Sequence, residues 1–158
     1  MREKNILDKW VLSLLNKLVS EVTTDLDNFD TASSIAKIGK FIDEFSTWYI
    51  RRSRDRTGVN AINEGDKNAF YSTCYEVLVT LCKIIAPIAP FMAEEIYKNL
   101  TNEESVHLVS WPEFDEKLID EKLEKEMFYA RQIVEQAHAM RRQQGEGYNL
   151  RQPLSSLA

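Results

Sequence analysis

Apolar side chains recur at three- and four-residue steps along most of the chain, which is the pattern of amphipathic α-helices. The first such stretch starts at Ile6 and continues for about 22 residues, the length of roughly six helical turns. The period breaks at residues 27–30, and Asp30 or Thr31 can cap a second helix by accepting hydrogen bonds from its free N–H groups. The apolar positions of the first helix are Leu7, Trp10, Val11, Leu14, Leu15, Leu18, Val19, Val22 and Leu26.

The second predicted helix ends in an arginine-rich segment. It runs to about Arg56, where Thr57 and Gly58 provide a stop. Gly39 lies inside it at a cost of about 1 kcal/mol relative to alanine, which is tolerable if another helix packs close to that position. We therefore expect such packing at Gly39. The apolar stripe of this helix consists of Ile35, Ile38, Phe41, Ile42, Phe45, Trp48 and Tyr49.

Two further helices are expected after a polar loop at residues 57–65. The third helix starts near Asp66 and carries an apolar face as far as Ile85. Pro87 and Pro90 cannot both continue it, because each lacks an N–H group and clashes with the preceding turn. We expect a break there, with Pro90 at the first position of a new helix that reaches about Leu100.

The last part of the chain predicts a strap and one more helix. Residues 106–111 alternate loosely and precede Pro112, which suggests a short extended strap lying across the bundle. A last helix is predicted over 117–144, and Gly145 and Gly147 terminate it. The sequence therefore predicts an all-α helical bundle over residues 1–144. Residues 145–158 read as a linker and the start of a truncated C-terminal element.

Composition narrows the class of protein. A chain of 158 residues with 44% hydrophobic and 28% charged residues can form one globular domain with a core. No run approaches the roughly 18 apolar residues of a membrane span, so we predict a cytoplasmic monomer with no membrane association. Cys74 and Cys82 lie in an apolar helical stretch with no metal-ligand spacing around them, and we read them as reduced core thiols.

Motifs of catalysis are absent from the sequence. There is no glycine-rich phosphate loop, no His-Glu-x-x-His and no serine in a Gly-x-Ser-x-Gly turn. His107 and His138 stand alone, as structural histidines usually do. We therefore predict no catalytic residue, no metal ligand and no cofactor site in this chain.

The segment WYIRRSRDR at 48–56 is the chemically unusual part of the chain. Four arginines fall within it, although the whole chain has a net charge of -5, which excludes a generally basic nucleic-acid binder and restricts any RNA contact to a local patch. Unpaired bases stack on aromatic rings and guanidinium planes, and arginine also forks onto phosphates. Equally, Trp48 could belong to the core and the arginines could complement the helix dipole. The candidate RNA-binding residues are Trp48, Arg51, Arg52, Arg54 and Arg56.

The order of segments resembles the helical anticodon-binding domain of class I aminoacyl-tRNA synthetases, in particular their isoleucyl branch. The similar stretches are LDKWVLSLLNKLV at 7–19, FIDEFSTWYIRRSRDR at 41–56, IIAPIAPFMAEEIY at 84–97, VHLVSWPE at 106–113 and RQPLSSL at 151–157. In the related methionyl branch an aromatic residue stacks on an anticodon base. With Phe41–Glu44 aligned on that branch, this residue falls on Trp48.

The resemblance implies a function. The chain would hold the anticodon stem and loop of isoleucine tRNA by the five candidate residues, with Tyr49 packed inward. The parent protein would be an isoleucine–tRNA ligase that uses ATP and magnesium in a catalytic domain that this chain lacks, so the chain alone is predicted to be inactive. The domain's opening helix would also lie upstream of Met1. The alternative is a helical protein-interaction module whose arginine patch binds an acidic protein partner.

Overall fold

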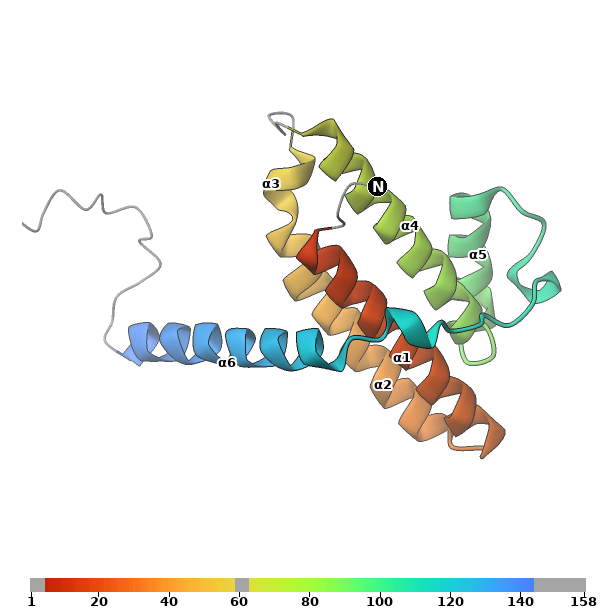
Figure 1. Cartoon of the computed structure of the whole chain (residues 1–158). Helices are drawn as coiled ribbons and strands as arrows, with labels where there is room; N and C mark the ends of the chain where they lie inside the picture. The colour runs from red at the N-terminus through yellow and green to blue at the C-terminus, as the bar shows by residue number, and fades with distance from the viewer. Residues whose placement is uncertain (1–4, 59–62, 144–158) are drawn as a thin grey trace, which may run out of the picture. The chain divides into compact units, whose positions relative to one another are not determined.

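The computed structural model describes residues 5–58 and 63–143, and all regular structure within these ranges is helical (Figure 1). The predicted all-α class is confirmed. The described residues divide after Glu121 into two compact units, which are treated separately. The elements in chain order are α1 (Ile6–Asp27), α2 (Thr31–Glu44), the π-helix η1 (Phe45–Ile50), α3 (Arg54–Thr57), α4 (Glu64–Ile85), α5 (Pro90–Thr101), the 3-10 helices η2 (Val106–Leu108) and η3 (Glu116–Leu118), and α6 (Glu121–Gln143).

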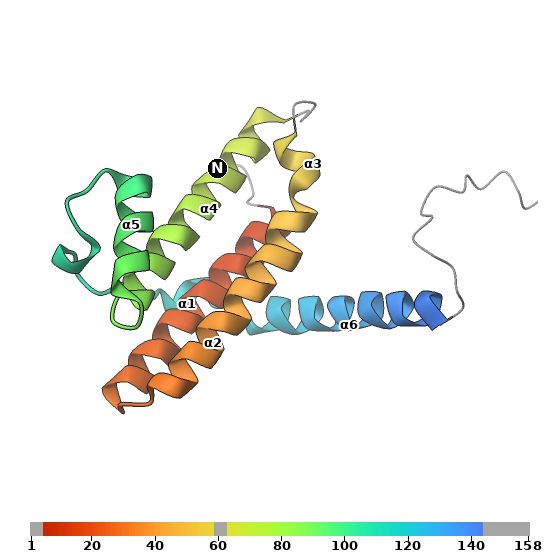
Figure 2. The ribbon, with the colours of Figure 1, turned by 180° about the vertical axis from the view of Figure 1, so that it is seen from behind.

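Helices α1 and α2 form a hairpin whose turn follows from local signals. The Asp30 carboxylate accepts a hydrogen bond from the Ser33 N–H at 3.0 Å, so the predicted cap is confirmed. Before it, Phe29 has a left-handed backbone with φ 59°, and the Asp30 N–H bonds back to the Asp25 carbonyl at 2.8 Å. This is the geometry of a Schellman turn, which closes a helix and reverses the chain. The two helices then lie side by side in both views (Figures 1 and 2).

Helix α1 is the centre of the first unit, because it packs against both α2 and α4. Trp10 and Val22 are 0% exposed, and neighbouring apolar side chains of α1 are nearly as well covered. Complete burial of a Val or Leu side chain contributes about 1.5–3 kcal/mol relative to leaving it in water. Asp8, Ser13 and Asn16 of the same helix are also buried, and each meets a polar partner described below.

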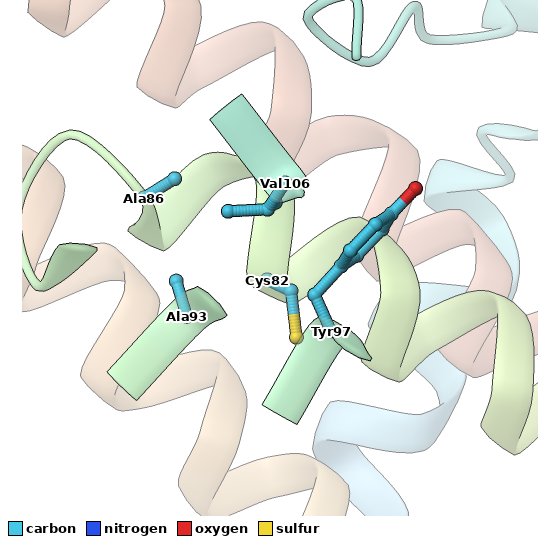
Figure 3. Packing of buried hydrophobic residues seen from close by; sticks show 5 residues of the cluster. All are labelled: Cys82, Ala86, Ala93, Tyr97 and Val106. Carbon is cyan, nitrogen blue, oxygen red and sulfur yellow. The ribbon is translucent and has the colours of Figure 1, made fainter. Parts of the chain in front are cut away.

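The proline break lies where the sequence predicts it. Helix α4 ends at Ile85, and Pro90 occupies the first position of α5. Beyond the break a small core forms between α4, α5 and η2 (Figure 3). Two of its residues are alanines, whose small side chains let the helices approach closely. The cluster consists of Cys82, Ala86, Ala93, Tyr97 and Val106.

The strap after α5 lies against the bundle, as predicted, but it is not extended throughout. Residues 106–108 form a 3-10 turn because the Ser105 side chain caps it and Glu94 accepts hydrogen bonds from the Ser105 hydroxyl and the Val106 N–H at 2.9 and 2.8 Å. The chain then runs back along α1. Three hydrogen bonds of 2.8 Å hold it there, from Trp111 Nε1 to Thr23, from the Asp115 N–H to Asn16 and from the Asp120 N–H to Ser13.

Three expectations need correction or fall outside the structure. Gly39 is exposed and an added Cβ would meet nothing within 4 Å, so the predicted close packing there is wrong. The last helix begins at Glu121 rather than 117, because Asp115 caps the separate turn η3. Gly145, Gly147 and the predicted element at 145–158 lie outside the described residues. No helix in the described ranges is long and apolar enough to cross a membrane.

Candidate nucleic-acid interface

The arginine-rich segment follows a ladder of aromatic rings. Phe41, Phe45 and Tyr49 stack with ring centroids 6.2 and 5.6 Å apart, and Phe70 of α4 continues the stack at 5.4 Å from Tyr49. Residues four apart on an α-helix advance by about 40° beyond a full turn, because one turn takes 3.6 residues. The wider turns of the π-helix η1 reduce this drift, so the rings stay on the buried side.

Tyr49 points into the bundle, as expected, and is 0% exposed. Its hydroxyl donates a hydrogen bond to Asp8 Oδ1 at 2.8 Å. Burial raises the pKa of Tyr49 above its ordinary value, and the hydrogen bond to the Asp8 carboxylate raises it further. On either side of Tyr49, Trp48 is half-buried and Ile50 is exposed.

Trp48 and Arg52 meet on the outer side. The Arg52 guanidinium carbon lies 5.3 Å from the centre of the half-buried Trp48 ring, in cation–π contact. Arg51, Arg52 and Arg54 are exposed. We call Trp48, Arg51, Arg52 and Arg54 the outer arginine segment. The contact between an aromatic plane and a guanidinium, which the helical spacing predicts, is therefore present.

Arg56 is placed differently from the other arginines. Its side chain is only 10% exposed and forks onto two carboxylates. Nη1 and Nη2 bond to the two Asp8 oxygens at 2.8 Å, while Nε and Nη2 bond to the Asp66 oxygens at 2.8 and 2.7 Å. These hydrogen bonds raise the pKa of Arg56, and the bonds to Asp8 have the largest effect. The structure therefore does not bring Arg56 together with the outer arginine segment.

Sequence reasoning missed Asp8 and Asp66, the partners of Arg56. Each lies in the first turn of a long helix, α1 or α4, where a negative charge is stabilised by the helix dipole. Arg56 lies in the last turn of α3, where a positive charge is favoured. One signal was available: Asp8 interrupts the apolar face of α1, and a carboxylate on a buried face requires a partner.

Two further features concern metal binding and thiol chemistry. The described residues contain no group of three or more His, Cys, Asp and Glu that could hold a metal ion. Cys74 and Cys82 are free thiols. Burial, and to a smaller extent the nearby charge of Asp8, raises the pKa of Cys74 to about 11. This thiol is therefore protonated at neutral pH.

A family model described as the anticodon-binding domain of tRNA ligase matches residues 8–155. The helical bundle with its arginine-rich helix end belongs to this family of anticodon-binding domains. The chain is similar to isoleucine–tRNA ligases, so the resemblance to the isoleucyl branch is confirmed. It is 44% identical to the enzyme of Clostridium acetobutylicum over 95% of this chain and 15% of that protein.

Further isoleucine–tRNA ligases are similar to the chain to the same extent. The isoleucine–tRNA ligase of Clostridium novyi is 42% identical over 98% of this chain and 15% of its own length. That of Cutibacterium acnes is 44% identical over 97% of this chain and 14% of its own length. The chain thus spans about 15% of the length of the curated relatives it matches.

Proposed function

We propose that this chain is the part of an isoleucine–tRNA ligase that holds the anticodon stem and loop of isoleucine tRNA. The observation that carries the proposal is the Arg52 guanidinium seated on the half-buried Trp48 ring, at an exposed helix end of an otherwise acidic chain. The family membership of the chain supports it. Trp48, Arg51, Arg52 and Arg54 are the proposed contacts.

The chemistry of these side chains suits a single-stranded loop. Stacking of a base on an aromatic ring contributes about 1–3 kcal/mol as measured by alanine substitution, and it tolerates any base. Exposed guanidinium groups can fork onto phosphates. A net charge of -5 repels RNA elsewhere on the surface, so the outer arginine segment would also set the orientation of the bound loop.

In the longer ligase, we place the ATP-dependent activation of isoleucine and its transfer to the tRNA in another domain. ATP and magnesium would bind in that other domain. This chain would contribute tRNA positioning and no catalytic group. We further propose that it acts as a monomer in the cytoplasm.

A salt-dependent titration with isoleucine tRNA tests the proposal. Replacing Trp48 by Ala should weaken binding with little change in the slope of log K against log salt. Replacing Arg52 by Gln should lower that slope by about 0.7–0.9, the value for one phosphate contact. Lys117→Gln removes an exposed positive charge from η3 and serves as the matched control.

Two outcomes would contradict the proposal. If wild-type chain does not bind tRNA at low salt, or if Arg52→Gln behaves like Lys117→Gln, the outer arginine segment does not contact RNA. If the chain binds poly-glutamate as tightly as it binds tRNA, the result would instead support a protein-interaction module with an acidic partner.

A further inference from the structure

Three helix ends meet at one buried group of charges. Asp8 lies in the first turn of α1, Arg56 in the last turn of α3 and Asp66 in the first turn of α4. Asp8 is 0% exposed, and the Arg56 guanidinium lies 5.8 Å from the centre of the Phe70 ring. Because Arg56 is the only one of the three on the arginine-rich segment, it connects that segment to both α1 and α4.

Asp8 holds the arginine-rich segment at two points. Its Oδ1 atom accepts from the Tyr49 hydroxyl and from Arg56 Nη1, each at 2.8 Å. These two donors flank Arg51, Arg52 and Arg54 in the sequence. Between them, residues 50–55 bury only one side chain, Ser53, whose hydroxyl has no hydrogen-bond partner among the described residues. The direction of the exposed arginines therefore depends on the two flanking anchors.

The charges around Arg56 argue against contact with RNA. Its guanidinium faces two carboxylates, Asp8 and Asp66, so the group carries a net negative charge. A phosphate approaching it would meet repulsion rather than attraction. The donors that could fork onto a phosphate are already bonded to the Asp8 and Asp66 oxygens.

We propose that Arg56 is a positioning residue: bonded to Asp8 and Asp66, it fixes the direction of the outer arginine segment for tRNA without touching the tRNA. This inference rests on the proposed function. It predicts that Arg56 affects the affinity for tRNA through the direction of the outer arginine segment. The three exposed arginines affect the affinity through their charge. Lysine keeps the charge of arginine but lacks the planar fork, so an arginine-to-lysine change separates the two effects.

The experiment compares Arg56→Lys with the matched change Arg52→Lys in the full chain. We expect Arg56→Lys to weaken tRNA binding about tenfold, as when the competent conformation falls to about a tenth of the population, with an unchanged salt slope. Arg52→Lys should also keep the salt slope and should weaken binding by less than about tenfold, since lysine still binds phosphate as a point charge although it loses the fork and the planar contact with Trp48. Hydrogen exchange of the amides at 45–57 should accelerate in Arg56→Lys and not in Arg52→Lys.

Several results would overturn the positioning role. Unchanged exchange at 45–57 in Arg56→Lys would do so, as would Arg56→Gln lowering the salt slope by as much as Arg52→Gln. If Arg56→Lys does not fold, Asp66→Asn provides the same comparison, because it leaves the Arg56–Asp8 pair in place. The exchange measurement needs no RNA, so it tests the positioning role even if tRNA binding by the outer arginine segment fails.

Discussion

Replacement of Tyr49 by Phe tests a buried hydroxyl that bonds to Asp8. The phenyl ring can keep its place between Phe45 and Phe70, whose centroids lie 5.6 and 5.4 Å away, so no apolar contact is lost. What disappears is the hydroxyl that donates to Asp8 Oδ1 at 2.8 Å. The change therefore removes the bond to the Asp8 carboxylate and, with it, a side-chain hydrogen bond between the same hydroxyl and Thr73.

The structure sets the expected size of this effect. A hydrogen bond to a charged group contributes about 1.5–3 kcal/mol to stability. Asp8 Oδ1 still accepts from Arg56 Nη1 at 2.8 Å after the change, so the carboxylate is not left without a partner. We therefore expect the lower end of the range, a loss of about 1.5 kcal/mol in the free energy of unfolding.

Urea unfolding followed by circular dichroism measures the loss. With a slope of about 1–3 kcal/mol per M for a small protein, the midpoint should fall by about 0.5–1.5 M. Tyr71→Phe is the matched control, because Tyr71 lies on α4 with 51% of its surface exposed and should change stability by less than about 0.5 kcal/mol. If the two variants unfold at the same urea concentration, the bond between Tyr49 and Asp8 does not stabilise the bundle.

Three further predictions concern other parts of the chain. Gly39→Ala should raise the free energy of unfolding by about 0.5–1 kcal/mol in the same urea assay, because α2 is helical there and an added Cβ meets nothing; a loss of stability would contradict this. The Lys98 ammonium, with the Val106 N–H and the Ser105 hydroxyl, lowers the pKa of Glu94 to about 2. The ionised Glu94 carboxylate therefore stabilises the folded chain fully above about pH 4.5, and this stabilisation is lost as pH falls toward 2. Glu94→Gln should accordingly destabilise the chain at pH 7 relative to Glu95→Gln, and the difference should shrink between pH 4.5 and 2; a constant difference would refute the ion pair's role. With a pKa of about 11, Cys74 should react with a thiol reagent at pH 8 far more slowly in folded than in urea-unfolded protein. Equal rates would contradict the conclusion that burial protects this thiol.

Local signals in the sequence predicted the helices well. The apolar period defines α1, and Asp30 caps α2 with its own carboxylate. Pro90 begins α5 because proline lacks the N–H that the first helical turn leaves unused. Each of these features depends on residues within about two turns of one another, which is why a sequence pattern can reveal them.

The candidate site could be predicted only in part. The contact between Trp48 and Arg52 follows from helical spacing and is present. The separate placement of Arg56 does not follow from helical spacing, because its partner Asp8 lies 48 positions away and nothing in the local pattern separates Arg56 from its neighbours. The π-helix was missed for a related reason: the aromatic ladder that favours it includes Phe70 of another helix.

The strap along α1 bears on how the chain folds. Its three hydrogen bonds join residues that are 88, 99 and 107 positions apart. Closing such long loops is entropically costly, and contacts of large sequence separation slow folding. The α1–α2 hairpin can form early from local contacts, whereas Asn16 and Ser13 acquire their strap partners only after residues 115 and 120, respectively, have been synthesised. Helix α1 is thus completed by a segment that follows it 88 to 107 positions later, and folding during synthesis should show a late step at that length.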